Sequence, residues 1–172
     1  MKKYYPIFFL AIIILSSVVL LSITNSLTKD RILAQEEEAT LTQLNNMFPE
    51  MTSYTLDSDI YFITADDNII GYAFKATGNG YGGSISILIG LETDKTSVKD
   101  ISIISNAETA GLGSRITLPS FTDRFIGKNI NDVKLTQDGG QIDGISGSTI
   151  SSRAVVETVR NTALEKIQKL AD

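Results

Sequence analysis

The longest apolar stretch of the chain comes first. Residues 4–28 carry no charge, and most positions from Ile7 to Ile23 are Ile, Leu, Phe or Val. A stretch of this length can cross a bilayer as one helix, and Tyr4 and Tyr5 stand at its edge, where aromatic residues favour the membrane interface. The alternative is a cleaved signal peptide, which normally has a shorter apolar region and a small-residue cleavage site. Length and flanks favour an uncleaved anchor over residues 1–28.

A helical pattern continues beyond the anchor. Apolar residues recur there at helical spacing, at Leu41, Leu44, Met47 and Phe48. Thr28 stands where it could cap the start of this helix, and Pro49 disfavours helical geometry at the residue before it. We therefore predict a connecting helix over residues 29–50 that packs on the domain after it.

Strand patterns occupy the next part of the chain. They are short runs rich in β-branched and aromatic residues, or runs of alternating character, near residue 54 and at 60–64, 70–76, 84–91 and 98–105. The connections between them are short, whereas parallel neighbours need long crossovers. The pattern predicts a twisted antiparallel sheet with packed helices, an α+β fold, in a domain over residues 51–172.

The final apolar pattern is again helical, with one face formed by Val156, Val159, Ala163, Ile167 and Leu170. A stretch rich in glycine, serine and threonine precedes it at residues 143–152, so Thr149 lies at or just before a helix N-terminus. Backbone N–H groups there lack intrahelical partners, and the helix dipole favours a bound phosphate. The alternative is that Ser148 and Thr149 only cap the helix, which is the commoner role of such residues.

Two further loops contain clustered glycines. Residues 78–83 read Gly-Asn-Gly-Tyr-Gly-Gly, where the backbone can approach a ligand closely and Tyr81 can stack on it or hydrogen-bond to it. On the residues alone, a plain hairpin connection is the commoner explanation of this stretch. Residues 106–113 follow a strand pattern, and Glu108 and Thr109 supply hydrogen-bonding groups within them.

Composition narrows the possible chemistry. The chain of 172 residues has no cysteine, which excludes disulfides, thiol catalysis and iron–sulfur ligation within it. It has no histidine either, so it lacks the commonest general base and the commonest metal ligand. We predict no catalytic residue and no metal site. The net charge of −5, without a basic cluster, argues against nucleic acid as a partner.

Residues 143–149 closely resemble the flavin-attachment motif of the FMN-binding domain family. That family includes the G subunit of Rnf-type electron transport complexes and the C subunit of sodium-translocating NADH:quinone oxidoreductase. The residues that fit the motif are Asp143, Gly144, Ser146, Gly147 and Thr149. In the family, a threonine at the position of Thr149 carries FMN through a phosphoester bond, which a separate flavin transferase forms. The usual alanine before it is Ser148 here, a nearly isosteric residue that adds a second hydroxyl.

The other two glycine-containing loops resemble parts of the same family, in the same order along the chain. Residues 106–113 are similar to its Glu-Thr-Pro-Gly-Leu-Gly signature, with Ala110 in place of proline and Asn106 where histidine is common. Arg115 is a candidate for neutralising flavin charge, or it is an ordinary surface residue. The cofactor-binding residues that the resemblance implies are Tyr81, Glu108, Thr109, Gly111, Leu112, Gly113, Asp143, Ser146, Gly147, Ser148 and Thr149.

The resemblance implies an electron-transfer flavoprotein subunit of an Rnf-like ion-translocating complex, with covalent FMN, rather than an independent enzyme. Its partners would be other membrane subunits, a flavin transferase and the lipid bilayer. The domain would lie on the outer face of the cytoplasmic membrane, an orientation that Lys2 and Lys3 before the span favour only slightly over Lys29 and Arg31 after it. Two alternatives remain: a stand-alone extracytoplasmic flavin carrier or reductase, and a tethered binding module without redox chemistry.

Overall fold

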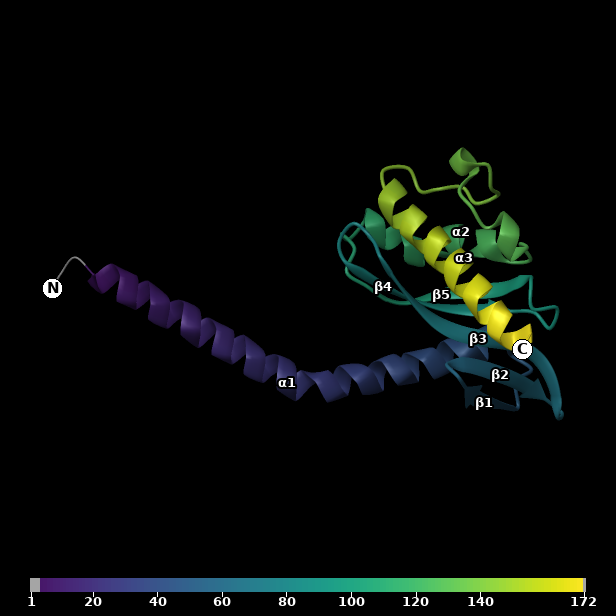
Figure 1. Ribbon diagram of the computed structural model, residues 1–172, viewed down its shortest axis with the longest axis horizontal. Helices are drawn as coiled ribbons and strands as arrows, with labels where there is room; N and C mark the ends of the chain where they lie inside the picture. The colour runs from purple at the N-terminus through teal and green to yellow at the C-terminus, as the bar shows by residue number, and fades with distance from the viewer. Residues whose placement is uncertain (1–3, 172) are drawn as a thin grey trace. The chain divides into compact units, whose positions relative to one another are not determined.

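The chain divides into two compact units, Met1–Glu38 and Ala39–Asp172. The structure is a computed structural model that describes residues 4–171, and Figure 1 shows its elements along the chain. Lys2 and Lys3, on which the expected orientation partly rests, lie outside the described residues. The expected division into an anchor, a connecting helix and a domain stays a prediction.

Helix α1, Tyr5–Met47, contains the apolar stretch. Its Ile7–Lys29 part has a mean hydropathy of 2.8 and none of it is buried, so its length and composition would let it cross a membrane. The side chain of Tyr5 is outside the described residues. The expected helix start at Thr28 is wrong, because the helix continues through it and the Thr28 hydroxyl donates to the Thr24 carbonyl at 2.7 Å. This bond is typical of threonine inside a helix.

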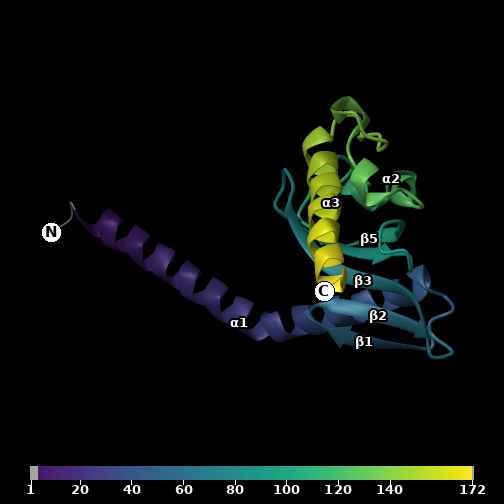
Figure 2. The same ribbon diagram turned by 45° about the vertical axis from the view of Figure 1, so that its right-hand side comes forward.

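Within residues 4–171, a sheet of five strands forms the centre of the second unit, in the order β1-β2-β3-β4-β5. The strands are β1 Ser53–Asp57, β2 Ile60–Ala65, β3 Asn68–Asn79, β4 Ser84–Leu91 and β5 Val98–Asn106. Each strand pairs antiparallel with the next one along the chain. The arrangement confirms the expected antiparallel α+β fold, and Figure 2 shows the twist of the sheet.

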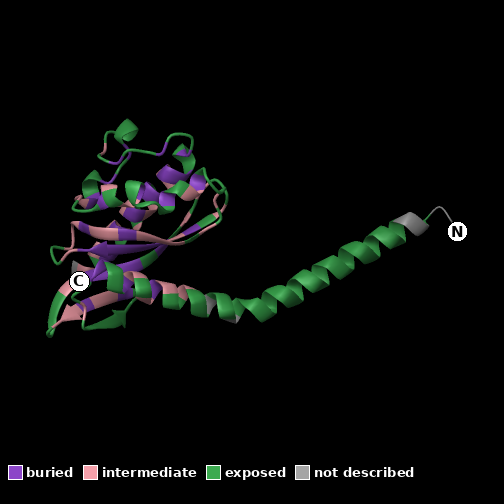
Figure 3. Ribbon diagram, turned by 180° about the vertical axis from the view of Figure 1, so that it is seen from behind, coloured by how far each residue is buried: buried purple, intermediate pink, exposed green. Residues whose placement is uncertain are grey.

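The two faces of the sheet belong to different apolar cores. Successive side chains of a strand point to opposite faces, so Phe74 of β3 joins the core under helix α3, Thr149–Ala171, whereas Ala73 joins the core on the other face. That second core includes the end of α1 and the residue after it, through Leu44, Met47 and Phe48. Figure 3 shows the buried positions concentrated in the sheet and the helices on it.

Short helices carry the chain from β5 back to the start of α3. They are helix α2, Pro119–Thr122, and the 3-10 helices Gly113–Thr117, Asp123–Phe125, Ile130–Asp132 and Thr136–Asp138. Phe121 and Phe125 are buried in the α3 core, with edge-to-face rings whose centroids are 5.5 Å apart. Because both rings belong to the core that the sheet and α3 share, their burial anchors the connection to the sheet.

The two ends of the sheet carry different connections. At one end, the β4–β5 turn is closed by Asp94, whose carboxylate accepts bonds from the Thr96 N–H, the Ser97 N–H and the Ser97 hydroxyl at 2.6 to 2.8 Å. The bond from the Ser97 hydroxyl is the main reason that the pKa of Asp94 lies below its usual range. At the other end, the β3–β4 loop and the loop after β5 lie beside each other, because Ile85 pairs with Asn106.

Candidate functional site

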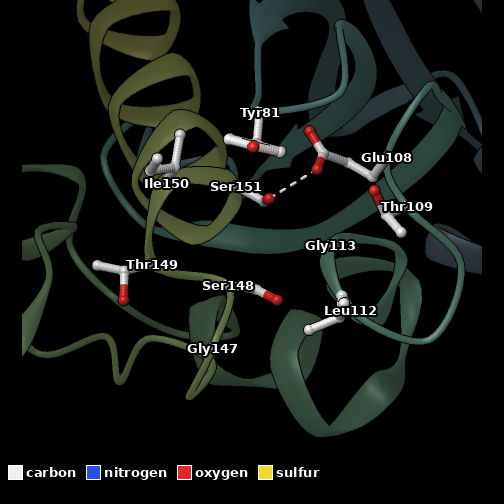
Figure 4. Close-up of a pocket in the computed structure, with 10 residues that line it drawn as sticks. All are labelled: Tyr81, Glu108, Thr109, Leu112, Gly113, Gly147, Ser148, Thr149, Ile150 and Ser151. Carbon is white, nitrogen blue, oxygen red and sulfur yellow. Dashed lines mark hydrogen bonds between the residues drawn. The ribbon is translucent and has the colours of Figure 1, made fainter.

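The start of α3 borders a cavity of about 380 Å³. Three segments line it: the β3–β4 loop, the loop after β5, and the turn that leads into α3. The lining residues are Tyr81, Glu108, Thr109, Leu112, Gly113, Gly147, Ser148, Thr149, Ile150 and Ser151. Figure 4 shows the residues of the two loops, among them Tyr81, Glu108 and Leu112, facing the start of α3 across the cavity. The fold therefore brings together the three loops that the sequence singled out, with eight of the eleven expected site residues among the described lining residues.

The Glu108 carboxylate joins two of these segments to its own. One of its oxygens accepts a hydrogen bond from the Gly82 N–H at 3.1 Å, and the other accepts one from the Ser151 hydroxyl at 2.8 Å. The Glu108 N–H donates to the side-chain oxygen of Asn106 at 3.1 Å. Because both carboxylate oxygens have protein partners, Glu108 holds the walls of the cavity in place.

Glycine is required where these walls approach each other. A Cβ atom at Gly82 would collide with the backbone oxygen of Ala107, and one at Gly113 would collide with the Glu108 carboxylate. The Ser151 hydroxyl also lies only 2.9 Å from the Cβ position at Gly113. The bonds of Glu108 can therefore form only because these positions have no side chain.

Ser152 fixes the turn before α3. Its hydroxyl accepts a bond from the Ile145 N–H and donates to the Ser148 carbonyl, both at 2.9 Å. The Ser152 N–H donates to the same carbonyl at 2.9 Å. Gly147, which lies between Ile145 and Ser148 in the chain, has a φ of +79°, a left-handed conformation that favours glycine. These bonds thus fix the backbone of the turn that carries the next two residues, Ser148 and Thr149.

Those two residues differ in accessibility. Ser148 is only 6% exposed, and its hydroxyl has no hydrogen-bond partner in the part of the chain that the structure describes. A capping serine would accept a bond from an N–H group in the first turn, so the capping alternative is wrong for the Ser148 side chain. Thr149 is the first residue of α3, as expected, and it is exposed. In Figure 4 the Ser148 hydroxyl points toward Leu112, while Thr149 lies on the far side of the helix start.

Three expected site residues lie away from this cavity. Asp143 and Ser146 line a neighbouring cavity of about 370 Å³, which Thr149 also borders. Gly111 is absent from the described lining of both cavities, and its N–H donates to the Ser114 hydroxyl at 2.9 Å, so it shapes the loop. Arg115, the candidate for charge neutralisation, is exposed and is likewise not among the described lining residues.

Sequence reasoning did not single out three residues of this region. Ile150 and Ser151 line the cavity, and the predicted helix start could have indicated them, because they belong to its first turn. Arg124 donates one guanidinium bond to the Asp143 carbonyl and another to the Ser120 carbonyl. No sequence pattern connects it to this loop. Between residues 4 and 171, no cluster of His, Cys, Asp or Glu side chains could hold a metal ion.

The site combines polar backbone groups with apolar walls. The first N–H groups of a helix have no intrahelical acceptor and favour an anion. Beside them, Tyr81, Leu112 and Ile150 are 74%, 52% and 58% exposed, so they offer unburied apolar surface around the cavity. A molecule with an anionic end and a flat or apolar part suits such a site. These features define a small-molecule-binding domain that follows a long apolar helix in the chain.

Comparison with known proteins identifies the family. Residues 80–164 match the FMN-binding domain family. The chain is 35% identical to the G subunit of the ion-translocating oxidoreductase complex of Vibrio vulnificus, over 89% of this chain and 84% of the relative. It is 34% identical to the corresponding protein of Methanosarcina acetivorans, over 66% of this chain but only 64% of that protein. This chain therefore belongs to the FMN-binding domain family, as the sequence resemblance implied.

Two solved structures have a similar fold. The C subunit of the Na(+)-translocating NADH-quinone reductase of Parabacteroides distasonis is 27% identical, with a TM-score of 0.53 over 63% of this chain and 61% of that one. Shewanella oneidensis NqrC is 16% identical, with a TM-score of 0.52 over 72% of this chain and 74% of that one, which shows likeness of fold alone.

Proposed function

We propose that this protein is an electron-transfer flavoprotein subunit of a membrane-bound, ion-translocating oxidoreductase complex of the Rnf type, with FMN attached to Thr149 through a phosphoester bond. The family supports FMN as the ligand. The relatives named as the G subunit of such a complex support a place among other subunits. The chain would carry electrons between those subunits rather than turn over a substrate of its own.

The contrast between Ser148 and Thr149 carries the proposal of the attachment site. A transferase must reach the hydroxyl that it esterifies, and only Thr149 of the two is exposed. Thr149 also occupies the first position of α3, where the helix dipole and the free N–H groups of the first turn would stabilise the negative charge of a phosphate. Both properties favour Thr149 as the acceptor.

The cavity fits the rest of the cofactor. Tyr81, Leu112 and Ile150 would contact the flat ring system through their exposed apolar surface. Glu108 would not bond to it directly but would hold the walls at the right separation. When bound, FMN supplies the ability to accept and release electrons, and the protein sets its position and surroundings.

The apolar part of α1 would serve as the membrane anchor. Ile7–Lys29 has the length and hydropathy for a single span, and a complex that moves ions across a membrane requires its subunits to be held there. We place the domain on the extracytoplasmic side. Residues 1–28 would form the anchor, residues 29–50 the connecting helix and residues 51–172 the FMN-binding domain. A mature protein that retains Ile7–Lys29 would have a membrane anchor, whereas a mature protein that lacks it would have lost a cleaved signal peptide.

An intact-mass measurement tests the attachment. The full-length protein is co-expressed with a flavin transferase, extracted in detergent and weighed beside Thr149→Ala. We expect the wild type to gain the mass of FMN minus water and the variant to gain nothing. Thr136→Ala is the matched control, and it should keep the adduct. Thr136 is exposed and borders the neighbouring cavity that Thr149 also borders, but it is not among the expected cofactor-binding residues.

Two results would contradict the proposal. An adduct that survives in Thr149→Ala would move the attachment site to another hydroxyl. No adduct on the wild type, while the same transferase modifies a known acceptor protein, would leave a tethered binding module without covalent flavin.

A further inference from the structure

We infer that the Ser148 hydroxyl donates a hydrogen bond to the phosphate end of the cofactor on Thr149, and that it acts as a buried positioning group beside the esterified residue. The inference rests on the proposed function. It assigns different roles to the two adjacent hydroxyls: Thr149 forms the covalent bond, and Ser148 orients what is bound.

The first support is the contrast with neighbouring serines. Among the residues that the structure describes, Ser148, Ser151 and Ser152 are the buried serines. The Ser151 hydroxyl donates to Glu108, and the Ser152 hydroxyl bonds to the Ser148 carbonyl and the Ile145 N–H. Of the three, only the Ser148 hydroxyl is without a partner. A buried polar group left unpaired costs about 1–3 kcal/mol of stability, so a ligand that supplies a partner would gain affinity from it.

The second support is the position of this hydroxyl. The Ser148 backbone is fixed, because its N–H donates to the Ile145 carbonyl and its own carbonyl accepts two bonds from Ser152. Its side chain lines the cavity and points toward Leu112 in Figure 4. Ser148 directly precedes Thr149 in the chain. The phosphate joined to Thr149 is therefore fewer bonds away from Ser148 than any other part of the cofactor. A serine hydroxyl is a good donor to a phosphate oxygen.

The test compares Ser148→Ala with Ser97→Ala, each with and without flavin, in the full-length protein. Without flavin, Ser148→Ala removes an unpaired group, so its thermal midpoint should equal or exceed that of the wild type. The rise in midpoint on flavin loading should be smaller than in the wild type. Ser97→Ala breaks the bond from the Ser97 hydroxyl to Asp94 in the β4–β5 turn, at the other end of the sheet. This bond exists in both forms, so the variant should lower both midpoints and leave the rise on loading unchanged.

A phosphorus NMR spectrum of the loaded proteins gives a second, independent readout. The phosphoester resonance should shift in Ser148→Ala and stay in place in Ser97→Ala. If loaded Ser148→Ala shows the wild-type rise in midpoint and an unshifted resonance, the inference is wrong while the proposed function stands. If Ser148→Ala carries no flavin and Thr149→Ala does, Ser148 is the acceptor and the inference is overturned. Absence of flavin from the wild type would overturn both.

Discussion

The two ends of the sheet use polar side chains in opposite ways. At the β4–β5 turn, Asp94 collects three hydrogen bonds from its own turn, within three residues along the chain. At the cavity end, Glu108 is bonded to groups 26 and 43 residues away, and the Ser148 hydroxyl has no partner among the described residues. At the β4–β5 turn, Asp94 finds its hydrogen-bond partners within the turn. The cavity end is assembled from segments that are distant in the sequence, and it leaves one buried hydroxyl unpaired.

The difference favours the cavity end as the place where a ligand binds. A connection that only joins two strands can satisfy its polar groups locally, as an Asx turn does. An incompletely satisfied cluster is destabilising by itself and persists at sites where something else completes it. The cavity end fits that description, and the turn end does not. Four substitutions test this comparison, beginning with the largest expected effect.

Glu108→Ala should destabilise the domain the most. It leaves the Gly82 N–H and the Ser151 hydroxyl without their acceptor, and bonds to a charged group contribute about 1.5–3 kcal/mol each. We expect a loss of about 2–3 kcal/mol in denaturant unfolding, less than the sum of the two bonds, because the bond from Gly82 is exposed and water can replace it. Glu92→Ala is the control at the turn end, where the exposed Glu92–Lys99 ion pair should contribute no more than about 1 kcal/mol. Equal losses would remove the distinction between the two ends.

Gly82→Ala should have the next largest effect. Its Cβ would meet the backbone oxygen of Ala107, which cannot move as a side-chain end could. We expect a loss of about 2 kcal/mol, because overpacking forces the backbone apart. Gly127→Ala is the matched control: its φ is +70°, but no described atom lies within 4 Å of the added Cβ, so only about 1 kcal/mol of backbone strain applies. Thermal unfolding of both variants would show whether close packing or φ dominates.

Asp94→Ala should cost about 1 kcal/mol, as the loss of a local cap does. The sign of its pH dependence follows from its pKa, which is lower in the folded state than in the unfolded chain. The stabilisation is therefore complete above the unfolded-state pKa and is lost as the pH falls through the lowered folded-state value, because the protonated carboxyl no longer accepts these bonds as a charged group. Unfolding free energies of wild type and variant should converge in acid, and a constant gap would contradict this cause.

Arg115→Ala should have the smallest effect. The side chain is exposed and is outside the described lining of both cavities, so stability should change by no more than about 0.5 kcal/mol. Flavin attachment, measured by intact mass, should match that of the wild type. A clear drop in attachment would show that Arg115 acts on the transferase or the phosphate.

Local patterns in the sequence predicted the local structure well. Alternating residues in β3 and β4 predicted strands, because one face of these strands carries most of the large apolar side chains of the core under α3. The helical stripe through Val156 and Val159 predicted α3. The false start at Thr28 arose because charged residues begin directly after it, at Lys29. The change in polarity marks a change of surroundings, whereas no helix-breaking residue interrupts α1 at that point.

The site was less predictable because its key bonds join distant segments. Glu108 and the glycines were recognised as loop residues, but their packing against Ser151 depends on the fold and not on any spacing. The same holds for Arg124, which reaches the Asp143 carbonyl from the short helices before it. The burial of Ser148 next to an exposed Thr149 also follows from the turn that Gly147 and Ser152 form.

Peptide mapping of the flavin-loaded protein tests the central claim most directly. Trypsin cuts after Lys134 and Arg153, so a single peptide, residues 135–153, contains every serine and threonine of the attachment loop. Fragmentation of that peptide localises the added mass. We predict FMN minus water on Thr149, with Ser148 unmodified. The added mass on Ser146 or Ser148, or no added mass on this peptide in a protein that carries flavin, would contradict the account.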